Sequence, residues 1–333
     1  MISTEYTISV IIPVHNAAPW LHRILDVLLD IQYPKLEIIA VENASTDGSF
    51  EILNKYQSRG VIVARNDMPG VSKARNTGIS LATAPYIMFV DADDIIDERL
   101  PSVLLEAMNK TSADMAICDF VYESECGEII ESQSLQKVAT FENDEILDKI
   151  LNYEGIAGYP VCKLFHAKII KDYSLKFDEN LRVHEDLLFV LMYSLHCKKV
   201  AYTPFCGYHY IHHENTANTT VSFRYSYDRL IARYKVCNLL KSKGKNIFLD
   251  REKNLLFKYL SDSIKLFKME EYDEKQEKSD ELVNLSKFVR INLCEMLINR
   301  SLPISLKMKF VFICLFGLNT WYAIQKVKNC FGV

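Results

Sequence analysis

Three carboxylates, Asp91, Asp93 and Asp94, directly follow a run of apolar residues at 86–90. A short unbroken apolar run is typical of a strand that is buried on both faces of a sheet. Because the acids cannot share that burial, we expect them at the strand's C-terminal end, the edge where open α/β sheets bind ligands. Carboxylates this close repel one another unless a cation or strong donors lie among them. A hard divalent ion that also grips a substrate diphosphate would meet that need.

The same acids have a second interpretation that requires no ligand. They could form a solvated turn and cap the helix that is expected to begin near Asp97 or Glu98, because acids are favourable at a helix N-terminus. For an isolated Asp-x-Asp-Asp stretch this second interpretation would be preferred. The rest of the chain must therefore decide between them.

Polar side chains also follow three earlier strands of the expected fold. The apolar segments 6–14, 36–41 and 61–64 predict these strands, and helical spacing predicts helices between successive strands. This alternation implies an α/β fold with a parallel sheet and right-handed crossovers. The polar groups after the four strands are His15 and Asn16, Glu42 and Asn43, Asn66 and Asp67, and Asp91 and Asp93. We expect all of them at one edge of one sheet.

Composition and missing motifs exclude several classes of protein. The first expected β–α turn has no G-x-G-x-x-G and no G-x-x-x-x-G-K-[ST], which argues against a dinucleotide oxidoreductase and a P-loop kinase. A formal charge of −4 gives no indication of nucleic-acid binding. The nine scattered cysteines predict reduced thiols in a cytoplasmic protein. We expect neither a signal peptide nor a membrane-spanning segment.

The second half of the chain changes character near residue 223. Before it, we expect a strand at 113–122, helices at 141–151 and 159–173, and two short strands at 200–202 and 207–211. The pair Glu185-Asp186 directly precedes an apolar helix. Beyond about residue 223 only helices are expected, at 225–243, 247–270, 279–299 and 304–328. The pattern predicts a catalytic domain at 1–222 and a helical region at 223–333.

Five ordered motifs together carry a family resemblance. They read Ile-Ile-Pro-Val-His-Asn, Val-Glu-Asn-Ala-Ser-Thr-Asp-Gly-Ser, Gly-Val-Ser-Lys-Ala-Arg-Asn-Thr-Gly-Ile, Phe-Val-Asp-Ala-Asp-Asp and His-Glu-Asp. The sequence over about 7–215 resembles the family 2 nucleotide-sugar glycosyltransferases of bacterial surface polysaccharide pathways. The resemblance implies the glycosyltransferase A fold, a Rossmann-like, mostly parallel central sheet flanked by helices. It also implies a nucleotide-sugar half at about 1–122 and an acceptor half at about 123–222.

The resemblance implies that the base and ribose of the donor lie at the first two strand ends. Pro13 and His15 would border the uracil or other base. Glu42 with Asn43 would hold the base or the ribose. In many family members an aspartate stands at the position of Glu42, and often at that of Asn43, so this sequence departs from the common pattern at both positions.

The diphosphate and the metal are implied at the next strand ends. Asn66 and Arg75 would lie along the nucleoside and the diphosphate, because a guanidinium fork suits anionic oxygens; a salt bridge on the helix surface is the alternative for Arg75. Asp91 would contact the ribose, and Asp93 would bind the Mn²⁺ or Mg²⁺ that bridges the diphosphate. His213 stands where such enzymes often place a further metal or phosphate contact, and a solvated loop is its alternative.

The Glu-Asp motif implies the catalytic carboxylates. The acceptor hydroxyl must lose a proton as it attacks, which requires a positioned base. The resemblance assigns that role to Asp186, with Glu185 orienting the acceptor or the base, and a single displacement with inversion follows. The alternative is that both acids only complement the dipole of the helix they begin.

Three functions remain open at this stage. The first is a metal-dependent inverting glycosyltransferase that moves a hexosyl or N-acetylhexosaminyl group from a nucleotide-diphosphate sugar, above all a UDP-sugar, to a hydroxyl of a glycan or lipid-linked acceptor. The second is a nucleotidyltransferase, which usually has a glycine-rich first loop that 13–18 lacks. The third is a non-catalytic sugar-nucleotide or protein-binding module, against which the intact Asp93 and Asp186 argue.

The last thirty residues have an unusual charge pattern. Residues 301–333 carry four lysines and no acid, and an apolar stretch at 310–318 lies between the lysine pairs. Such a segment is typical of a helix lying in an anionic membrane surface, through 303–330, which would place the enzyme at the inner face of the membrane. The alternative is a final helix that packs across the core.

Overall fold

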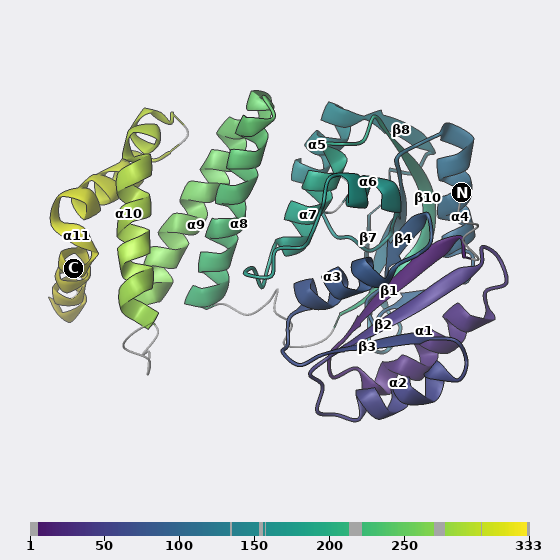
Figure 1. Ribbon diagram of the computed structural model, residues 1–333. Coiled ribbons are helices and arrows are strands. Elements are labelled where there is room, and N and C mark those ends of the chain that lie inside the picture. The colour runs from purple at the N-terminus through teal and green to yellow at the C-terminus, as the bar shows by residue number, and fades with distance from the viewer. Residues whose placement is uncertain are drawn as a thin grey trace. The chain divides into compact units, whose positions relative to one another are not determined.

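A computed structural model describes residues 6–133, 135–152, 156, 158–212, 222–269, 277–300 and 302–331. The chain divides into two compact units, Met1–Thr216 and Ala217–Val333. Figure 1 shows the first as a sheet with helices and the second as helices alone. Each unit is described by itself.

The first half of unit one is a parallel sheet of four strands, with the polar strand ends at one edge. Strands β3, β2, β1 and β4 are neighbours in that order, and each pairs in parallel with the next. The elements are β1 (Ile8–Val14), α1 (Ala18–Asp30), β2 (Leu36–Asn43), α2 (Ser49–Gln57), β3 (Ile62–Asn66), α3 (Val71–Leu81) and β4 (Tyr86–Phe89). The predicted alternation of strands and helices is confirmed here.

The second half extends the same sheet with mixed pairing. Beyond β4 the order is β9, β6, β10 and β5, and β9 runs antiparallel to both β4 and β6, whereas β6 and β10 are parallel. The elements are β5 (Ile95–Ile96), α4 (Leu100–Thr111), β6 (Met115–Ser124), β7 (Ile129–Gln133), β8 (Ala139–Glu142), α5 (Asn143–Asn152), β9 (Lys163–His166), α6 (Ala167–Asp172), α7 (Glu185–Ser194) and β10 (Lys199–His212). Strand β10 contains register shifts between Thr203 and Tyr208.

The helix expected at 159–173 is wrong. Residues Lys163–His166 form strand β9, and only Ala167–Asp172 is helical. Leu164 and Phe165 are both fully buried although successive side chains of a strand point to opposite faces, as required of a strand in the middle of a covered sheet. The two short strands expected at 200–202 and 207–211 are likewise one continuous strand, because the bulge between them does not end the pairing with β6.

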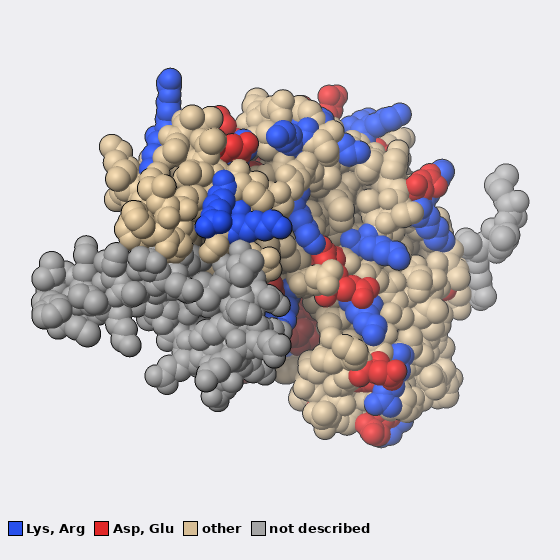
Figure 2. All heavy atoms as spheres, turned by 60° about the vertical axis from the view of Figure 1, so that its left-hand side comes forward, with Lys and Arg blue, Asp and Glu red and all other residues tan. Residues whose placement is uncertain are grey.

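The surface carries both signs of charge. On the face shown in Figure 2, lysine and arginine side chains lie beside acidic ones. This mixture agrees with a sequence that has 39 basic and 43 acidic residues.

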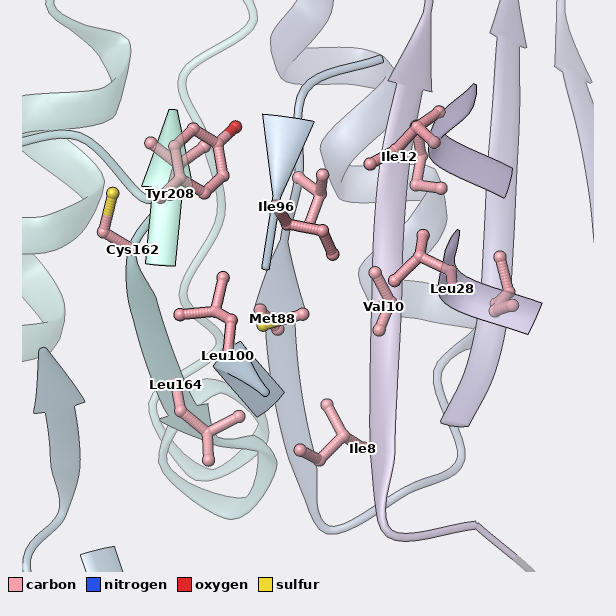
Figure 3. Close-up of a cluster of buried hydrophobic side chains, with 14 of the residues drawn as sticks. Ile8, Val10, Ile12, Leu28, Met88, Ile96, Leu100, Cys162, Leu164 and Tyr208 are labelled. Atoms are coloured by element: carbon pink, nitrogen blue, oxygen red, sulfur yellow. The ribbon is translucent and has the colours of Figure 1, made fainter. Parts of the chain in front are cut away.

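The core beneath the site is a continuous apolar cluster that includes β1, β4 and the start of α4 (Figure 3). In Figure 3 Tyr208 and Ile12 lie near the top of the view, and Leu164 and Ile8 lie near the bottom. Helix α3 packs on the opposite face of β1 very closely, because a Cβ added at Gly78 would lie 2.3 Å from Cγ2 of Ile11. A glycine at this position therefore lets the helix, and with it Arg75, approach the sheet.

The second unit consists of helices α8 (Phe223–Ser242), η1 (Asn246–Phe248), α9 (Leu249–Met269), α10 (Glu277–Ile298) and α11 (Ile304–Phe331). Helices α8 and α9 share a buried ion pair between Arg233 and Glu252, 2.5 Å apart. Helix α11 is interrupted at Gly317, where φ is 80°. None of the described helices combines the length and the apolar character that crossing a membrane requires.

Candidate active site

A cleft of about 290 Å³ opens at the C-terminal ends of β1, β2 and β4. Its lining comprises Pro13, Val14, His15, Ala17, Trp20, Asn43, Pro69, Gly70, Val71, Arg75, Asp91, Ala92 and Asp93. Six residues that the sequence singled out meet in this one cleft: Pro13, His15, Asn43, Arg75, Asp91 and Asp93. Parallel strands bring their carboxyl ends to one edge, which is why residues so far apart in sequence converge.

The outer part of the cleft is formed by the ends of β1 and β2. His15 Nδ1 lies 2.7 Å from the carbonyl oxygen of Asn43, and Nε2 lies 3.4 Å from Nδ2 of Asn16. A carbonyl can only accept, so Nδ1 carries the proton and donates. This bond fixes the imidazole ring at the rim of the cleft and leaves Nε2 as an acceptor.

Arg75 connects the cleft to helix α7. Its Nη2 donates to Asp91 Oδ1 at 3.1 Å, and its Nη1 donates to Glu185 Oε1 at 3.3 Å. The guanidinium is 5% exposed and lies over the ring of Phe177. Burial alone would lower the pKa of Arg75, but Asp91 and Glu185 raise it, so the arginine is firmly charged. It is not the surface salt bridge considered as its alternative.

The loop after β4 is held from two sides. Arg23 in α1 donates to the backbone oxygens of Asp93 at 2.7 Å and Asp94 at 3.3 Å. The Tyr208 hydroxyl donates to Asp94 Oδ2 at 2.5 Å and accepts from the N–H of Asp91 at 3.1 Å. Asp94 is 2% exposed, and burial together with Asp91 and Asp93 raises its pKa well above the usual range. Asp94 therefore anchors the loop, whereas Asp91 and Asp93 line the cleft.

Glu185 and Asp186 form the first turn of α7. Residue His184, at the N-cap, has a left-handed backbone with φ of 63°. Glu185 is 7% exposed, and burial together with the adjacent Asp186 raises its pKa to about 8, although Arg75 opposes the shift. Burial also raises the pKa of Asp186, whose Oδ1 accepts from the N–H of Leu187 at 2.7 Å. Two neighbouring carboxylates whose surroundings shift their pKa values differently are the usual arrangement for general acid–base catalysis.

Helix α3 begins against the cleft with Pro69, Gly70 and Val71 in its lining. Its N-cap, Gly70, has φ of 155° and supplies no side-chain cap. The first N–H groups of a helix have no partner within it, and the end of the helix is partially positive. Together with Arg75, this end of α3 suits anionic oxygens.

Two predicted site residues lie outside the cleft lining, and a third lies outside the described residues. Glu42 is fully buried and outside the cleft lining; its carboxylate accepts from the N–H of Ser45 and pairs with Arg65 Nε at 3.0 Å. Asn66 is also outside the lining, and its Oδ1 accepts from the Thr77 hydroxyl at 3.2 Å. His213 lies outside the described residues.

Sequence reasoning missed several residues of the site. Trp20 lines the cleft from α1, Arg23 holds the acidic loop, and Tyr208 bridges that loop to β10. Trp20 and Arg23 lie in an ordinary amphipathic helix, and Tyr208 in an ordinary strand pattern. Nothing in their spacing distinguishes them from residues of the core or surface.

The residues at the cleft fit a divalent cation that is shared with a diphosphate. Among the described residues there is no group of three or more His, Cys, Asp or Glu side chains placed to hold a metal alone. Mg²⁺ and Mn²⁺ accept one or two carboxylates and take their other ligands from phosphate and water. Asp93, partly buried in the lining of the cleft, is the carboxylate that would hold such an ion there.

Comparison with known proteins agrees with this geometry. The family model for glycosyl transferase family 2 matches residues 9–174, which include β2–β4, all of β1 except its first residue, and the cleft. The chain belongs to glycosyl transferase family 2. Its fold, a central sheet flanked by helices, is the glycosyltransferase A fold, and the C-terminal helices follow it.

Curated relatives of this family 2 glycosyltransferase match it over part of their length. The uncharacterized glycosyltransferase EpsJ of Bacillus subtilis is 29% identical over 188 residues, 55% of each protein. The poly(ribitol-phosphate) beta-N-acetylglucosaminyltransferase TarS of Staphylococcus aureus is 25% identical over 234 residues, 67% of this chain and 39% of TarS. The chain thus spans about half of EpsJ and two fifths of TarS.

Solved structures extend the likeness of the fold. The S. aureus TarS structure of residues 1–349 in complex with UDP has a TM-score of 0.64 and 16% identity, covering 98% of this chain and 92% of that one. A mannosyltransferase of Pyrobaculum calidifontis in complex with GDP-Man and Mn²⁺ has a TM-score of 0.50 and 12% identity, covering 99% and 88%. At these identities the likeness concerns the fold.

Proposed function

We propose that this chain is an inverting glycosyltransferase that moves a hexosyl or N-acetylhexosaminyl group from a nucleotide-diphosphate sugar, above all a UDP-sugar, to a hydroxyl of a glycan or lipid-linked acceptor in cell-surface polysaccharide synthesis. The observation that carries it is the position of Arg75, which is ion-paired at once to Asp91 in the cleft and to Glu185 beside Asp186. A donor site and a pair of catalytic carboxylates are thereby joined through one side chain. The TarS structures with UDP and with UDP-GlcNAc support the choice of nucleotide.

The donor would occupy the cleft along the strand ends. Pro13, His15 and Asn43 would enclose the base, and Asp91 would contact the ribose. The diphosphate would lie against the N-terminus of α3 and Arg75, where N–H groups and a buried guanidinium offer donors to its oxygens. A divalent cation at Asp93, once bound, would stabilise the negative charge that develops on the departing diphosphate. Direct contacts of Glu42 and Asn66 with the donor remain predictions. Both side chains lie outside the cleft lining, where Glu42 pairs with Arg65 and Asn66 accepts from Thr77.

Asp186 would take the proton from the acceptor hydroxyl. Burial and the adjacent Asp186 raise the pKa of Glu185 to about 8, so the pair would share a proton near neutral pH, and the hydrogen bond that Asp186 accepts from the N–H of Leu187 favours the ionised form of Asp186. Asp186 would then be the ionised member and the base, and Glu185 would orient it. A single base facing a single leaving group across the sugar carbon gives one displacement with inversion.

The proposal is tested by separating donor binding from transfer. Release of nucleoside diphosphate from a panel of UDP- and GDP-sugars is measured with Mn²⁺, with Mg²⁺ and in chelator, for the natural chain and for Asp93→Asn and Asp186→Asn. Asp93→Asn should weaken nucleotide binding and abolish its metal dependence. Asp186→Asn keeps the shape of the side chain, so donor affinity should persist while transfer falls by about 10²–10⁴, the usual contribution of a general base.

Two outcomes would contradict the proposal. Full activity in excess chelator would show that the reaction needs no divalent cation at Asp93. Near-normal transfer by Asp186→Asn would show that another carboxylate is the base, because asparagine replaces aspartate well if only helix capping is required.

We also propose peripheral contact of the second unit with a membrane. Helix α11 buries Phe310 and Ile313, so it is part of the packed unit, but Ile304, Met308 and Leu315 are 78%, 62% and 70% exposed. An outward apolar row on an acid-free, lysine-bearing segment suits an anionic lipid surface. Such contact would bring a cytoplasmic enzyme to a lipid-linked acceptor.

A further inference from the structure

Three tyrosine side chains form a contiguous cluster at the C-terminal edge of the sheet. Tyr122 in β6 and Tyr210 in β10 are direct partners in the parallel register, with ring centroids 5.4 Å apart. Tyr159, from the segment before β9, stacks on Tyr210 at 6.2 Å with an interplanar angle of 25°. The hydroxyls of Tyr122 and Tyr159 lie 3.3 Å apart. All three side chains are partly exposed.

This tyrosine cluster (Tyr122, Tyr159, Tyr210) lies outside the donor cleft, on strands β6 and β10 and on the segment before β9. None of its members is among the residues that line that cleft. Tyr210 stands two residues after Tyr208 in β10, so both point to the same face, and the Tyr208 hydroxyl is 3.1 Å from the N–H of Asp91. Asp91 in turn pairs with Arg75 at 3.1 Å, and Arg75 pairs with Glu185, which is next to Asp186, at 3.3 Å, so a chain of contacts leads from this end of β10 to the proposed base.

The strands of the cluster lie on the side of β4 that is opposite to β1 and β2. The donor cleft is bounded by β1, β2, β4 and the start of α3. The acceptor hydroxyl must reach Asp186 while that cleft is filled, so it must approach from beyond β4. Strands β6 and β10 lie on that side of β4 in the sheet.

The chemistry of the cluster favours a neutral, hydroxyl-rich ligand. Partly exposed tyrosines present a flat apolar ring and a polar hydroxyl at once, which is how aromatic side chains orient ligands with one apolar and one polar face. Burial, with Asp91 and Asp94 adding to it, raises the pKa of Tyr210, so its phenol stays neutral. The neighbouring carboxylates disfavour a second anion near these rings.

We propose that Tyr122, Tyr159 and Tyr210 form the acceptor subsite and that its ligand is a neutral sugar ring, which stacks on the tyrosine rings and presents one hydroxyl to Asp186. This proposal rests on the proposed function, since it assigns the acceptor side of the same reaction. The paired hydroxyls of Tyr122 and Tyr159 would hydrogen-bond the ring's other hydroxyls.

The test follows individual tyrosines in the full chain loaded with UDP and Mn²⁺. Tyrosine rings are labelled with ¹³C, the signals are assigned by single Tyr→Phe changes, and methyl β-glucopyranoside, methyl N-acetyl-β-glucosaminide and ribitol 5-phosphate are titrated in turn. A neutral sugar should shift the signals of the three cluster tyrosines in a saturable manner. Tyr33 and Tyr173, which are 69% and 53% exposed, are the matched controls and should not respond.

Two variants separate stacking from packing. Tyr159→Phe keeps the ring and should retain the sugar-induced shift of Tyr210, whereas Tyr159→Leu should weaken sugar affinity at least tenfold. UDP affinity, measured separately by calorimetry, should stay within twofold in both. If Tyr159→Leu does not fold, the labelled natural chain and Tyr159→Phe still decide the question.

The outcomes distinguish this proposal from the one on which it rests. Absence of UDP binding would contradict the donor site and the proposed function. Normal UDP binding with no saturable shift from either neutral sugar, or with equal shifts at Tyr33, would overturn the acceptor subsite alone. A response to ribitol 5-phosphate without one to the neutral sugars would overturn the assigned ligand class.

Discussion

At the scale of residues, the charge of Arg75 limits how many of the acids around it can be ionised at the same time. Its buried guanidinium is shared by Asp91 and Glu185, and Asp186 stands directly beside Glu185. The single positive charge of Arg75 cannot balance Asp91, Glu185 and Asp186 if all three are ionised. The remaining negative charge is costly in a buried place unless one acid keeps its proton. Burial and the adjacent Asp186 raise the pKa of Glu185 to about 8, so we expect Glu185 to be that acid.

This gives a prediction about stability and pH. The pKa of Glu185 is raised in the folded protein above about 4.3, the value expected when unfolded, so between pH 4 and 8 the folded state binds a proton that the unfolded state does not. The free energy of unfolding should therefore fall as pH rises through this window. Glu185→Gln removes the effect, so its melting temperature relative to the natural chain should be higher at pH 9 than at pH 5.

The control for this measurement is an exposed acid. Glu98 is exposed in the turn before α4, and Glu98→Gln should change the melting temperature equally at both pH values. A difference between Glu185→Gln and the natural chain that is the same at pH 5 and pH 9 would show that Glu185 is already ionised at the lower pH.

Residue roles were predictable from sequence only where the backbone alone places the side chain. His15, Asn43 and Asp91 follow strands, and the carboxyl ends of parallel strands share an edge. Glu42 precedes Asn43 by one residue, so its side chain points to the other face, where Arg65 is its cross-strand partner. An acidic residue next to the cleft and one in it look alike in sequence.

At the scale of elements, strands β1–β4 could be predicted from the local sequence, whereas strand β9 could not. The first four strands alternate with amphipathic helices, and each strand has a local apolar run that predicts it. The segment 161–170 has apolar residues at spacings that also fit a helix. Residues Lys163–His166 of this segment form a strand because they pair with β4 on one side and β6 on the other, both far away in sequence. Such tertiary pairing overrides local preference.

The packing of α3 on β1 gives the second prediction. Gly78→Ala would place its Cβ 2.3 Å from Ile11 Cγ2, so the helix must move away from the sheet. Overpacking of this kind costs about 1–3 kcal/mol, and since α3 carries Arg75, nucleotide affinity should fall as well. Urea unfolding and UDP titration measure the two effects.

A second substitution makes this prediction sharper. Ile11→Ala combined with Gly78→Ala should recover nucleotide affinity relative to Gly78→Ala alone, because it removes the atoms in conflict. Ser80→Ala, on the exposed face of the same helix, is the control and should leave both measurements nearly unchanged. If Gly78→Ala is as stable as the natural chain and binds UDP normally, close approach of α3 is not what positions Arg75.

At the scale of the whole molecule, the sequence indicated two parts, because alternating strands and helices give way to helices alone near residue 223. In the second part, the sequence left the role of the last helix open. Helix α11 was expected either to lie in a membrane surface or to pack on a core. Phe310 and Ile313 are 0% and 1% exposed, and Lys309 donates to Ser261 Oγ at 3.3 Å, so one face of the helix is packed. The other face keeps its apolar side chains outside. The expectation of a helix that packs on a core is met by the packed face, and membrane contact of the outward face stays a prediction.

The last prediction uses that difference of faces. Met308→Gln with Leu315→Gln removes two outward apolar side chains and leaves Phe310 and Ile313 in place, so the melting temperature should not change. Binding to vesicles containing phosphatidylglycerol should weaken at least about tenfold, since each such side chain contributes on the order of 1 kcal/mol or more when it leaves water.

Ile247→Gln, at a residue 82% exposed in η1, is the matched control because it removes an equally exposed apolar side chain elsewhere in the unit. Cosedimentation of the full chain with vesicles at low and high salt gives the measurement, and salt should weaken the lysine contribution. Equal loss from Ile247→Gln and from the α11 variant would mean that general surface hydrophobicity, and not this face of α11, brings the protein to the membrane.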